Sequence, residues 1–384
     1  MKSPNIKLLQ VNYLSIPMGR LAFKNRQCFF EYTAQFLETG LQLSPFKLPL
    51  QSGLIPCQER VFDGLFGVFN DSLPDGWGRL LQDRKLMNLG IDPSSLSPLD
   101  RLYYVGKQGM GALSYEPAIE PSHITSLPNL DQIAQECIEI QNDQGPEFID
   151  ELLVLNGSSA GARPKVVTPQ WIIKFPSTTD PKDIGAIEYA YHLMAQAAKI
   201  TVPEARLFPS RKHAGYFGVA RFDRQDSTPI HMHTAAGLLH IDYRLPNLDY
   251  ETLMRATLFL TRDLREAEKQ LRATAFNVFA HNRDDHAKNF SFVMSETGLW
   301  QVSPAYDLTF SAGPQGEHAS TIMGEGKNPG MLHLQKLAAI SAIAPQTATA
   351  IIEEVRAAIS KWSLFAKQAD VSAQSTKRIQ LAIN

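Results

Sequence analysis

The stretch His281-Asn282-Arg283-Asp284-Asp285-His286-Ala287-Lys288-Asn289 is the part of the chain on which the prediction of the fold depends. Upstream of it, apolar residues recur with helical spacing, so we expect a helix over residues 263–280 that ends at His281-Asn282. Downstream, residues 290–294 are typical of a short strand. The sequence therefore predicts a polar loop between a core helix and a strand, where rigid scaffolds commonly position catalytic side chains.

Three polar residues in and after this loop have the spacing of a known catalytic arrangement. Asp284 and Asn289 stand five positions apart, and Asp307 follows eighteen positions after Asn289. Protein kinases use an Asp-x-x-x-x-Asn loop and a later Asp to supply a catalytic base and two metal-binding residues. Asp, Asn and His are also common in loops because they cap helices and form turns, so the loop alone leaves both interpretations open.

The composition is that of an ordinary globular protein. With 384 residues, 44% of them hydrophobic and 20% charged, the chain is long enough for two or three domains. Its net charge of −2 gives no general reason to expect direct binding to nucleic acid or to a membrane. Cys28, Cys57 and Cys137 are too few and too widely spaced for a disulfide framework or a zinc site. We find no signal peptide or membrane-spanning stretch and expect a cytoplasmic protein.

The N-terminal part of the chain predicts a small β-rich unit. Residues 5–33 contain alternating runs with β-branched and aromatic residues, which favour an antiparallel sheet. A helix is expected from about Leu80 to Leu89. The glycines of residues 103–113 favour a structural turn over a phosphate-binding loop. Residues 116–129 contain three prolines and mark the first domain boundary.

A loop rich in glycine, alanine and serine follows in the middle of the chain. After a predicted helix at about residues 130–140, the apolar run 152–155 predicts a strand, and residues 156–165 connect it to further apolar strands. Small residues allow backbone N–H groups to approach phosphate oxygens closely. The loop lacks the P-loop pattern but suits the glycine-rich lid of kinases, and an ordinary hairpin turn is the alternative.

Lys174 lies in the apolar strand of residues 171–175 and needs an anionic partner if it is buried. Glu188, near the start of a predicted helix, is placed to supply one, together with a nucleotide phosphate. An edge-strand Lys that prevents aggregation is the alternative. The strand of residues 215–220 leads into Arg221, where the backbone would lie beside an adenine if a nucleotide pocket is present.

The C-terminal part of the chain is predicted to be mostly helical, with helices at residues 249–261, 263–280, 332–340 and 345–366. Residues 311–330 contain five glycines and predict a long polar loop beside the site, a place for a mobile segment. His231, His233 and His240 lack the spacing of metal ligands, so a polar loop or a substrate-facing surface is the favoured interpretation.

Six separated segments together resemble the HipA family of bacterial toxin kinases. They are Leu73-Pro74-Asp75, Ser158-Ser159-Ala160-Gly161-Ala162-Arg163-Pro164-Lys165, Ile172-Ile173-Lys174-Phe175-Pro176, Arg221-Phe222-Asp223-Arg224, Asp284-Asp285-His286-Ala287-Lys288-Asn289-Phe290-Ser291 and Pro304-Ala305-Tyr306-Asp307. The resemblance covers about residues 60–310. It implies an α+β, protein-kinase-like fold with two lobes. We expect a β-rich N-terminal subdomain at 1–125, a mixed-sheet N-lobe at 126–248 and a helical C-lobe at 249–384.

The resemblance also implies a function. A member of this family would be a serine/threonine-protein kinase that uses ATP and Mg²⁺ and acts in a type II toxin–antitoxin system linked to persistence. Its partners would be a HipB-like helix-turn-helix antitoxin, through which it would reach DNA, and a protein substrate such as glutamyl-tRNA synthetase or another aminoacyl-tRNA synthetase. The alternatives are a catalytically silent corepressor bound to HipB and a small-molecule kinase of the aminoglycoside type.

Residue roles carried over from the family centre on Asp284, which would be the catalytic base, and on Asn289 and Asp307, which would hold Mg²⁺. Lys174 would pair with the α- and β-phosphates and with Glu188. The further residues implied to bind nucleotide are Ala160, Gly161, Ala162, Arg163, Pro164 and Lys165 in the phosphate loop, Ala220, Arg221 and Phe222 at the hinge, and His286, Ala287, Lys288 and Tyr306.

Two further positions belong to the segments that carry the resemblance, Ser158 and Asp285. Ser158, with Ser159 as second candidate, would be autophosphorylated, and the added negative charge would repel nucleotide. Asp285 stands where the family commonly has Gly, and a carboxylate that hydrogen-bonds away from the site is the harmless interpretation. Residues 231–250 differ from the best-known toxin, so the protein target may differ as well.

Overall fold

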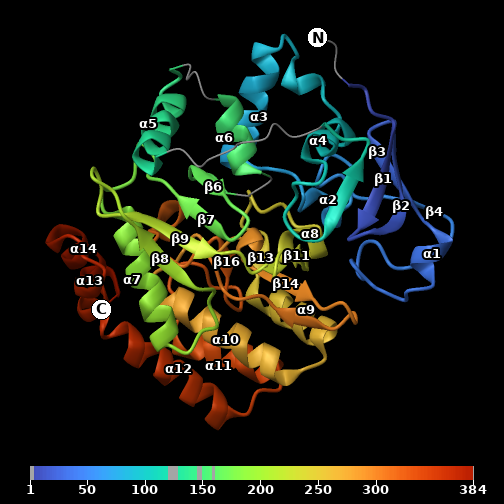
Figure 1. Cartoon of the computed structure of the whole chain (residues 1–384). Helices are drawn as coiled ribbons and strands as arrows, with labels where there is room; N and C mark the ends of the chain where they lie inside the picture. The colour runs from blue at the N-terminus through green and yellow to red at the C-terminus, as the bar shows by residue number, and fades with distance from the viewer. Residues whose placement is uncertain (1–3, 120–128, 145–148, 158–160, 384) are drawn as a thin grey trace.

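The computed structural model in Figure 1 describes residues 4–119, 129–144, 149–157 and 161–383. Its N-terminal part contains a five-stranded antiparallel sheet of order β4-β3-β2-β1-β5. The strands are β1 (Leu8–Tyr13), β2 (Ile16–Lys24), β3 (Gln27–Tyr32), β4 (Leu54–Pro56) and β5 (Leu113–Glu116). Alternate residues Leu9, Val11 and Tyr13 of β1 are buried, as expected for a sheet with one face on the core. The predicted antiparallel sheet is confirmed.

The same N-terminal part of the chain contains four helices: α1 (Ala34–Leu37), α2 (Gly67–Asn70), α3 (Gly76–Asn88) and α4 (Pro98–Val105). Helix α4 begins with a capping box, in which Ser97 and Asp100 bond each other's backbone N–H groups. The helix predicted from about Leu80 to Leu89 is present as α3, which begins earlier, at Gly76, and ends at Asn88.

A second antiparallel sheet has the order β6-β7-β9-β8 and lies beside helix α7 (Ile184–Ala197) in Figure 1. Its strands are β6 (Lys165–Val167), β7 (Trp171–Lys174), β8 (Ala205–Phe208) and β9 (Tyr216–Ala220). Two helices precede it, α5 (Leu130–Gln141) and α6 (Ile149–Asn156).

The prediction of a strand at residues 152–155 is wrong, because these residues belong to helix α6. Leu152 and Leu155 are buried in one cluster with Trp77 and Leu81 of α3. A short apolar run is compatible with either structure, and here the packing on α3 favours the helix. The small-residue loop therefore connects a helix to strand β6 instead of two strands.

The remainder of the chain is mainly helical around a small sheet of order β12-β14-β15. The strands are β12 (His231–Thr234), β14 (Ser291–Met294) and β15 (Trp300–Val302), and the helices are α8 (Ala235–Leu239), α9 (Tyr250–Thr261), α10 (Leu264–Phe279), α11 (Met331–Ile340), α12 (Pro345–Ile359), α13 (Trp362–Gln368) and α14 (Ala373–Ile383). Two short ladders complete the described sheets: β10 (Arg224–Gln225) with β11 (Thr228–Pro229), and β13 (Leu248–Asp249) with β16 (Ser320–Thr321).

The single helix predicted over residues 345–366 is interrupted at Ser360-Lys361. Helix α12 ends at Ile359, and α13 begins at Trp362. The interruption allows Trp362 to be fully buried, with its ring centroid 5.3 Å from that of Tyr191 in α7. Tertiary packing of one large aromatic side chain thus overrides a continuous helical pattern.

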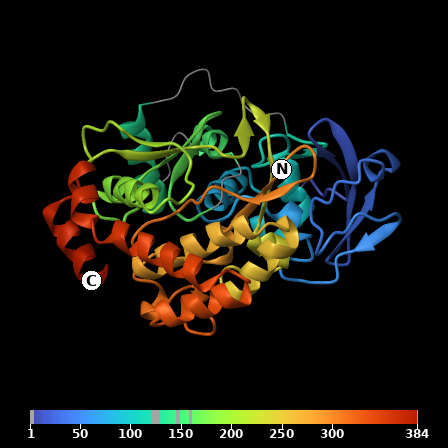
Figure 2. The ribbon, with the colours of Figure 1, turned by 90° about the horizontal axis from the view of Figure 1, so that it is seen from below.

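Buried apolar residues form two clusters that cross the predicted domain boundaries. The first extends from the N-terminal sheet through α9 and α10 to α12 and α13. Figure 2 shows the N-terminal sheet and α13–α14 at opposite ends of the molecule. The second joins α3 to α5, α6, β6 and β7. Helix α3 therefore packs with the second sheet, although it belongs to the N-terminal third of the sequence, and the boundaries at 125 and 248 stay predictions.

In the part of the chain that the structure describes, no helix is both long enough and apolar enough to cross a membrane.

Candidate active site

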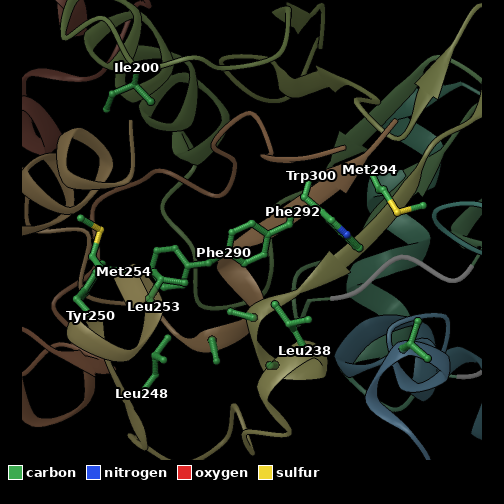
Figure 3. Packing of buried hydrophobic residues seen from close by; sticks show 14 of the residues in the cluster. Ile200, Leu238, Leu248, Tyr250, Leu253, Met254, Phe290, Phe292, Met294 and Trp300 are labelled. Carbon is green, nitrogen blue, oxygen red and sulfur yellow. The ribbon is translucent and has the colours of Figure 1, made fainter. Parts of the chain in front are cut away.

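The loop of residues 281–289 lies between α10 and β14, as predicted. Helix α10 is capped at its N-terminus by Asp263, whose carboxylate accepts a hydrogen bond from the Arg265 N–H at 2.9 Å. After the loop, Phe290 enters the core beside Leu253 and Met254 of α9, and Phe292 follows on the side of Trp300 (Figure 3). The loop is thus held at both ends by buried residues, which restricts the positions that its polar side chains can take.

Asp284 and Asn289 are bonded to each other within the loop. The Asn289 side-chain amide donates to the Asp284 carbonyl oxygen at 2.6 Å, which leaves the amide oxygen of Asn289 as the atom that can bind a cation. The Asp284 side chain is exposed. Partial loss of hydration and the nearby Asp307 raise the pKa of Asp284 above its usual range, and His286 acts in the opposite direction.

Lys174 on β7 forms ion pairs with Glu188 of α7 and with Asp307, which follows β15. Its ammonium lies 3.1 Å from a Glu188 carboxylate oxygen and also donates to Asp307. Glu188 on α7 is almost fully buried. The predicted Lys174–Glu188 pair is therefore present, and the alternative of an edge-strand Lys is excluded because β7 lies between β6 and β9. Burial alone would raise the pKa of Asp307, but Lys174 and Lys165 more than offset it, so the pKa lies well below its usual range.

The backbone at Asp307 is in the left-handed region, with φ of 53°. Residues other than glycine rarely adopt this conformation, and Asp and Asn tolerate it best. The preceding residue, Tyr306, donates from its hydroxyl to the Lys288 carbonyl oxygen at 2.6 Å. Asp307 is therefore held by a tight backbone turn that is bonded to the loop of Asp284.

Arg163 from the predicted phosphate loop takes part in the same charge cluster. Its guanidinium contacts Glu188 at 2.9 Å and binds both carboxylate oxygens of Asp180 at 3.1 Å. Lys165 stands opposite Lys174 in the β6–β7 ladder. Burial lowers the pKa of Lys165, and Lys174 acts in the same direction, while Asp307 acts against them. Sequence reasoning missed Asp180, since nothing in its surroundings sets it apart from an ordinary loop Asp.

Lys288, expected to lie against phosphates, has a protein partner in this structure. Its ammonium pairs with Asp75, which comes from the start of α3, and lies 4.5 Å from the ring centroid of Tyr243. The His286 ring is tilted against the same Tyr243 ring, with the centroids 5.6 Å apart, and its Nδ1 is buried without a hydrogen-bond partner among the described residues. Ala287 is fully buried in the first core cluster and packs the loop in place.

Asp285 points away from this charge cluster, in agreement with the harmless interpretation. It is buried, and its carboxylate accepts from the Tyr250 hydroxyl at 2.8 Å and contacts His318 at 2.9 Å. The Ser320 N–H donates to it at 3.2 Å, and the Ser320 hydroxyl donates to the Asp285 carbonyl at 2.5 Å. Asp285 thus joins the loop of residues 281–289 to the long segment of residues 311–330.

The predicted loop of residues 311–330 has further bonds to its surroundings. Asp249 accepts from the Thr321 hydroxyl at 2.6 Å and from the Gly324 N–H at 2.8 Å. The Arg283 carbonyl accepts from the Ala319 N–H at 3.0 Å. These bonds place the segment against the candidate catalytic loop, as its sequence suggested.

The predicted hinge at Ala220, Arg221 and Phe222 is largely committed to internal bonds. The N–H groups of Ala220 and Arg221 donate to Glu204 and Gln170 at 2.7 and 2.9 Å. The Arg221 side chain binds both oxygens of the fully buried Asp223. Phe222 lies beside the site, since its ring centroid is 5.5 Å from that of Tyr306. The N–H groups of Ala220 and Arg221 are therefore already bonded within the protein, and the adenine-binding role of this segment stays a prediction.

The three histidines expected on a polar loop or surface are buried instead. His231 Nε2 lies 3.0 Å from the Leu43 carbonyl, and His233 lies between Ser44 and Asp71, at 3.0 and 2.6 Å. His240 Nε2 accepts from the Gly67 N–H at 2.8 Å. They differ from the prediction because the N-terminal part covers them. Ser44, His233 and Asp71 have the connectivity of a hydrolase triad, but Ser44 is buried, so a substrate has no access to its hydroxyl.

The residues that the structure brings together are Arg163, Lys165, Lys174, Glu188, Asp284, Asn289 and Asp307. Ser158, Ser159 and Ala160 lie outside the described residues. Among the described residues, no group of three or more His, Cys, Asp or Glu side chains could hold a metal ion. Mg²⁺ needs fewer protein ligands, because it is usually bound by one or two carboxylates together with phosphate oxygens and water. Asp307 and the Asn289 amide oxygen fit this requirement.

Domain models of one protein family match both the N-terminal and the C-terminal part of the chain. The model of the HipA N-terminal domain matches residues 9–116, and that of the HipA-like C-terminal domain matches residues 157–362. A Sinorhizobium fredii protein named "Putative kinase Y4dM" is 24% identical over 208 residues. The match covers 50% of this chain and 50% of that protein, so the chain spans about half the length of this curated relative.

Two solved structures match this chain to different extents. The HipA of a Shewanella oneidensis MR-1 complex of HipA, HipB and operator DNA has a TM-score of 0.72 at 17% identity, covering 97% of this chain and 95% of that chain. The Helicobacter pylori kinase CtkA has a TM-score of 0.36 at 11% identity, covering 57% of this chain and 95% of that one. The first match confirms the predicted α+β fold class.

Proposed function

Because the chain belongs to the HipA family, we propose that it is an ATP-dependent serine/threonine-protein kinase. The observation that carries the proposal is the pairing of Lys174 with both Glu188 and Asp307. The three residues come from β7, α7 and the segment after β15, and they are the types that kinases use to bind phosphates, to orient the Lys and to bind metal. A purely structural role for three such charges would not require Asp284 and Asn289 beside them.

The charges of the cluster suit a nucleotide. Lys174, Lys165 and Arg163 would bind phosphate oxygens, with Glu188 holding two of these cations in place. Asp307 stays anionic at neutral pH because its pKa is well below the usual range. Mg²⁺, when bound to Asp307 and Asn289, would neutralise charge that develops on the transferred phosphoryl group. Asp284, whose pKa is raised, would accept the proton of a substrate hydroxyl.

We also propose the partners and the regulation of this kinase. The S. oneidensis structure contains HipB and operator DNA, which supports a HipB-like antitoxin as partner and contact with DNA through that antitoxin. The proposed protein substrate is an aminoacyl-tRNA synthetase, for example glutamyl-tRNA synthetase. Autophosphorylation at Ser158, or at Ser159, would place negative charge beside the phosphate-binding cations and weaken nucleotide binding.

Incubation of the purified full chain with labelled ATP and Mg²⁺ tests the proposal. We expect label on Ser158 or Ser159 of the wild type, located by mass spectrometry, and none in Asp284→Asn. Asp143→Asn is a matched control, because Asp143 is exposed and pairs with Arg84 far from the catalytic loop in sequence. Label transfer in Asp284→Asn equal to that of the wild type would contradict the proposal. ATP binding without phosphorylation of any protein would favour the corepressor alternative.

A further inference from the structure

Asp75 occupies an unusual place at the start of a helix. It is the N-cap residue of α3, yet its carboxylate accepts no hydrogen bond from the first turn of that helix. One oxygen instead accepts the N–H of Gly161 in the phosphate loop, and the other pairs with the ammonium of Lys288 in the catalytic loop. A single side chain from the N-terminal part of the sequence thus contacts both loops of the candidate active site.

The backbone of the same helix start reinforces this contact. The Trp77 N–H donates to the Gly161 carbonyl oxygen at 3.1 Å, so Gly161 is bonded through both its N–H and its carbonyl. Gly76 has φ of +42°, and a Cβ added there would lie 2.6 Å from that carbonyl oxygen and 2.8 Å from the Ala162 Cα. Only a residue without a side chain allows α3 to approach the phosphate loop this closely.

These contacts are buried, and the helix that carries Asp75 is packed into the second core cluster. The side chains of Lys288 and Asp75 are only 6% and 13% exposed. Trp77 is fully buried in the second core cluster, together with Val166 of β6 and Ile173 of β7. The start of α3 is therefore held against the sheet that carries Lys165 and Lys174, and any displacement of Asp75 would be transmitted to the loops beside it.

We propose that Asp75 is a positioning residue of the nucleotide site, which holds the phosphate loop at Gly161 and Lys288 of the catalytic loop in the geometry that binds phosphate. This role rests on the proposed kinase function, because it concerns how well ATP is held. Asp75 would act through Gly161 and Lys288, which it contacts directly. The N-terminal HipA domain would thereby contribute a side chain that supports the ATP site.

Asp75→Asn tests the role in steady-state kinetics of the full chain with ATP and Mg²⁺. The Asn side chain keeps an acceptor for the Gly161 N–H but removes the charge that holds Lys288. We expect KM for ATP to rise about tenfold with a change in kcat of less than about threefold, since a misplaced binding group weakens binding more than chemistry. Asp75→Ala, which loses both contacts, should raise KM further. Asp143→Asn should leave both constants unchanged.

Hydrogen–deuterium exchange provides a second readout that does not depend on activity. In Asp75→Ala, we expect faster exchange in peptides covering residues 161–167 and unchanged exchange in α10. Faster exchange across the whole chain, α10 included, would overturn the role, because Asp75 would then act on global stability. Wild-type KM in both Asp75 variants would overturn it too. Failure of the wild type to bind ATP would refute the kinase function itself, and is thus distinguished from a failure of the Asp75 role alone.

Discussion

Asp284 and Asp285 are neighbours in the sequence and have opposite surroundings in the structure. Asp284 is exposed and lies within electrostatic reach of Asp307 and His286. Asp285 is buried and is bonded to Tyr250, His318 and Ser320. The loop of residues 281–289 therefore has one open face, which carries the exposed Asp284, and one closed face, where the charge of Asp285 is satisfied by the protein. The difference shows that one residue of the loop can be accessible while its neighbour fixes the loop to the protein.

The largest effect that we expect is the loss of phosphotransfer in Asp284→Asn. A positioned general base contributes roughly 10²- to 10⁴-fold to the rate, equivalent to about 3–5 kcal/mol. Because Asp284 is on the open face, the free energy of unfolding should change by less than about 0.5 kcal/mol. Rate measurements and urea denaturation of the same variant check both expectations. A large loss of stability would show that Asp284 is also a structural residue and would weaken the comparison.

Asp285→Ala should mainly reduce the stability of the protein. The substitution leaves the Tyr250 hydroxyl, His318 and the Ser320 N–H without their buried acceptor. We expect a loss of about 3 kcal/mol in the free energy of unfolding, measured by urea denaturation. Asp143→Ala, at an exposed position, is the control and should be close to neutral. A neutral effect at Asp285 would mean that the closed face does not stabilise the loop.

The free energy of unfolding should fall at acid pH, because the protein contains a buried histidine. Burial lowers the pKa of His231 from 6.5 to about 4. The unfolded chain therefore binds a proton near pH 6.5 and the folded chain only near 4, so stability is lost as the pH falls through this window. We expect His231 alone to cost about 2 kcal/mol between pH 7 and pH 5. Denaturation at both pH values should show a smaller pH effect in His231→Gln, and an equal effect would contradict the assignment.

The smallest effect concerns a single hydrogen bond of the closed face. Ser320→Ala removes the buried hydroxyl that donates to the Asp285 carbonyl oxygen at 2.5 Å. We expect a loss of about 1 kcal/mol in the free energy of unfolding. If the segment of residues 311–330 supports the open face only through Asp285, kcat should change little. A loss of activity much larger than the loss of stability would indicate that the segment acts on the substrate directly.

Several residues of the candidate site could be predicted from the sequence because each stands out in its local sequence. The spacing of Asp284, Asn289 and Asp307 is visible along the chain, and Lys174 is conspicuous in an apolar strand. The Lys174–Glu188 pair was expected from a short separation between a strand and the next helix, and the structure confirms it. Periodicity likewise predicted the antiparallel N-terminal sheet and most helices of the C-terminal part.

The rest could not be predicted because it depends on contacts between distant segments. Asp75 and Lys288 are separated by 213 positions, and no spacing rule relates them. The histidines of residues 231–240 look like surface residues until the N-terminal part covers them. The run at residues 152–155 fits a strand or a helix equally well until α3 supplies a surface for it to pack on.

The left-handed backbone at Asp307 has a practical consequence for the design of inactive variants. A β-branched or bulky residue there would strain the turn as well as remove the carboxylate, so lost activity could not be attributed to chemistry alone. Asn tolerates the same conformation and removes only the negative charge. Asp307→Asn is therefore the substitution whose phenotype can be interpreted, and it suits cellular assays in which the folded but silent protein must still meet its partners.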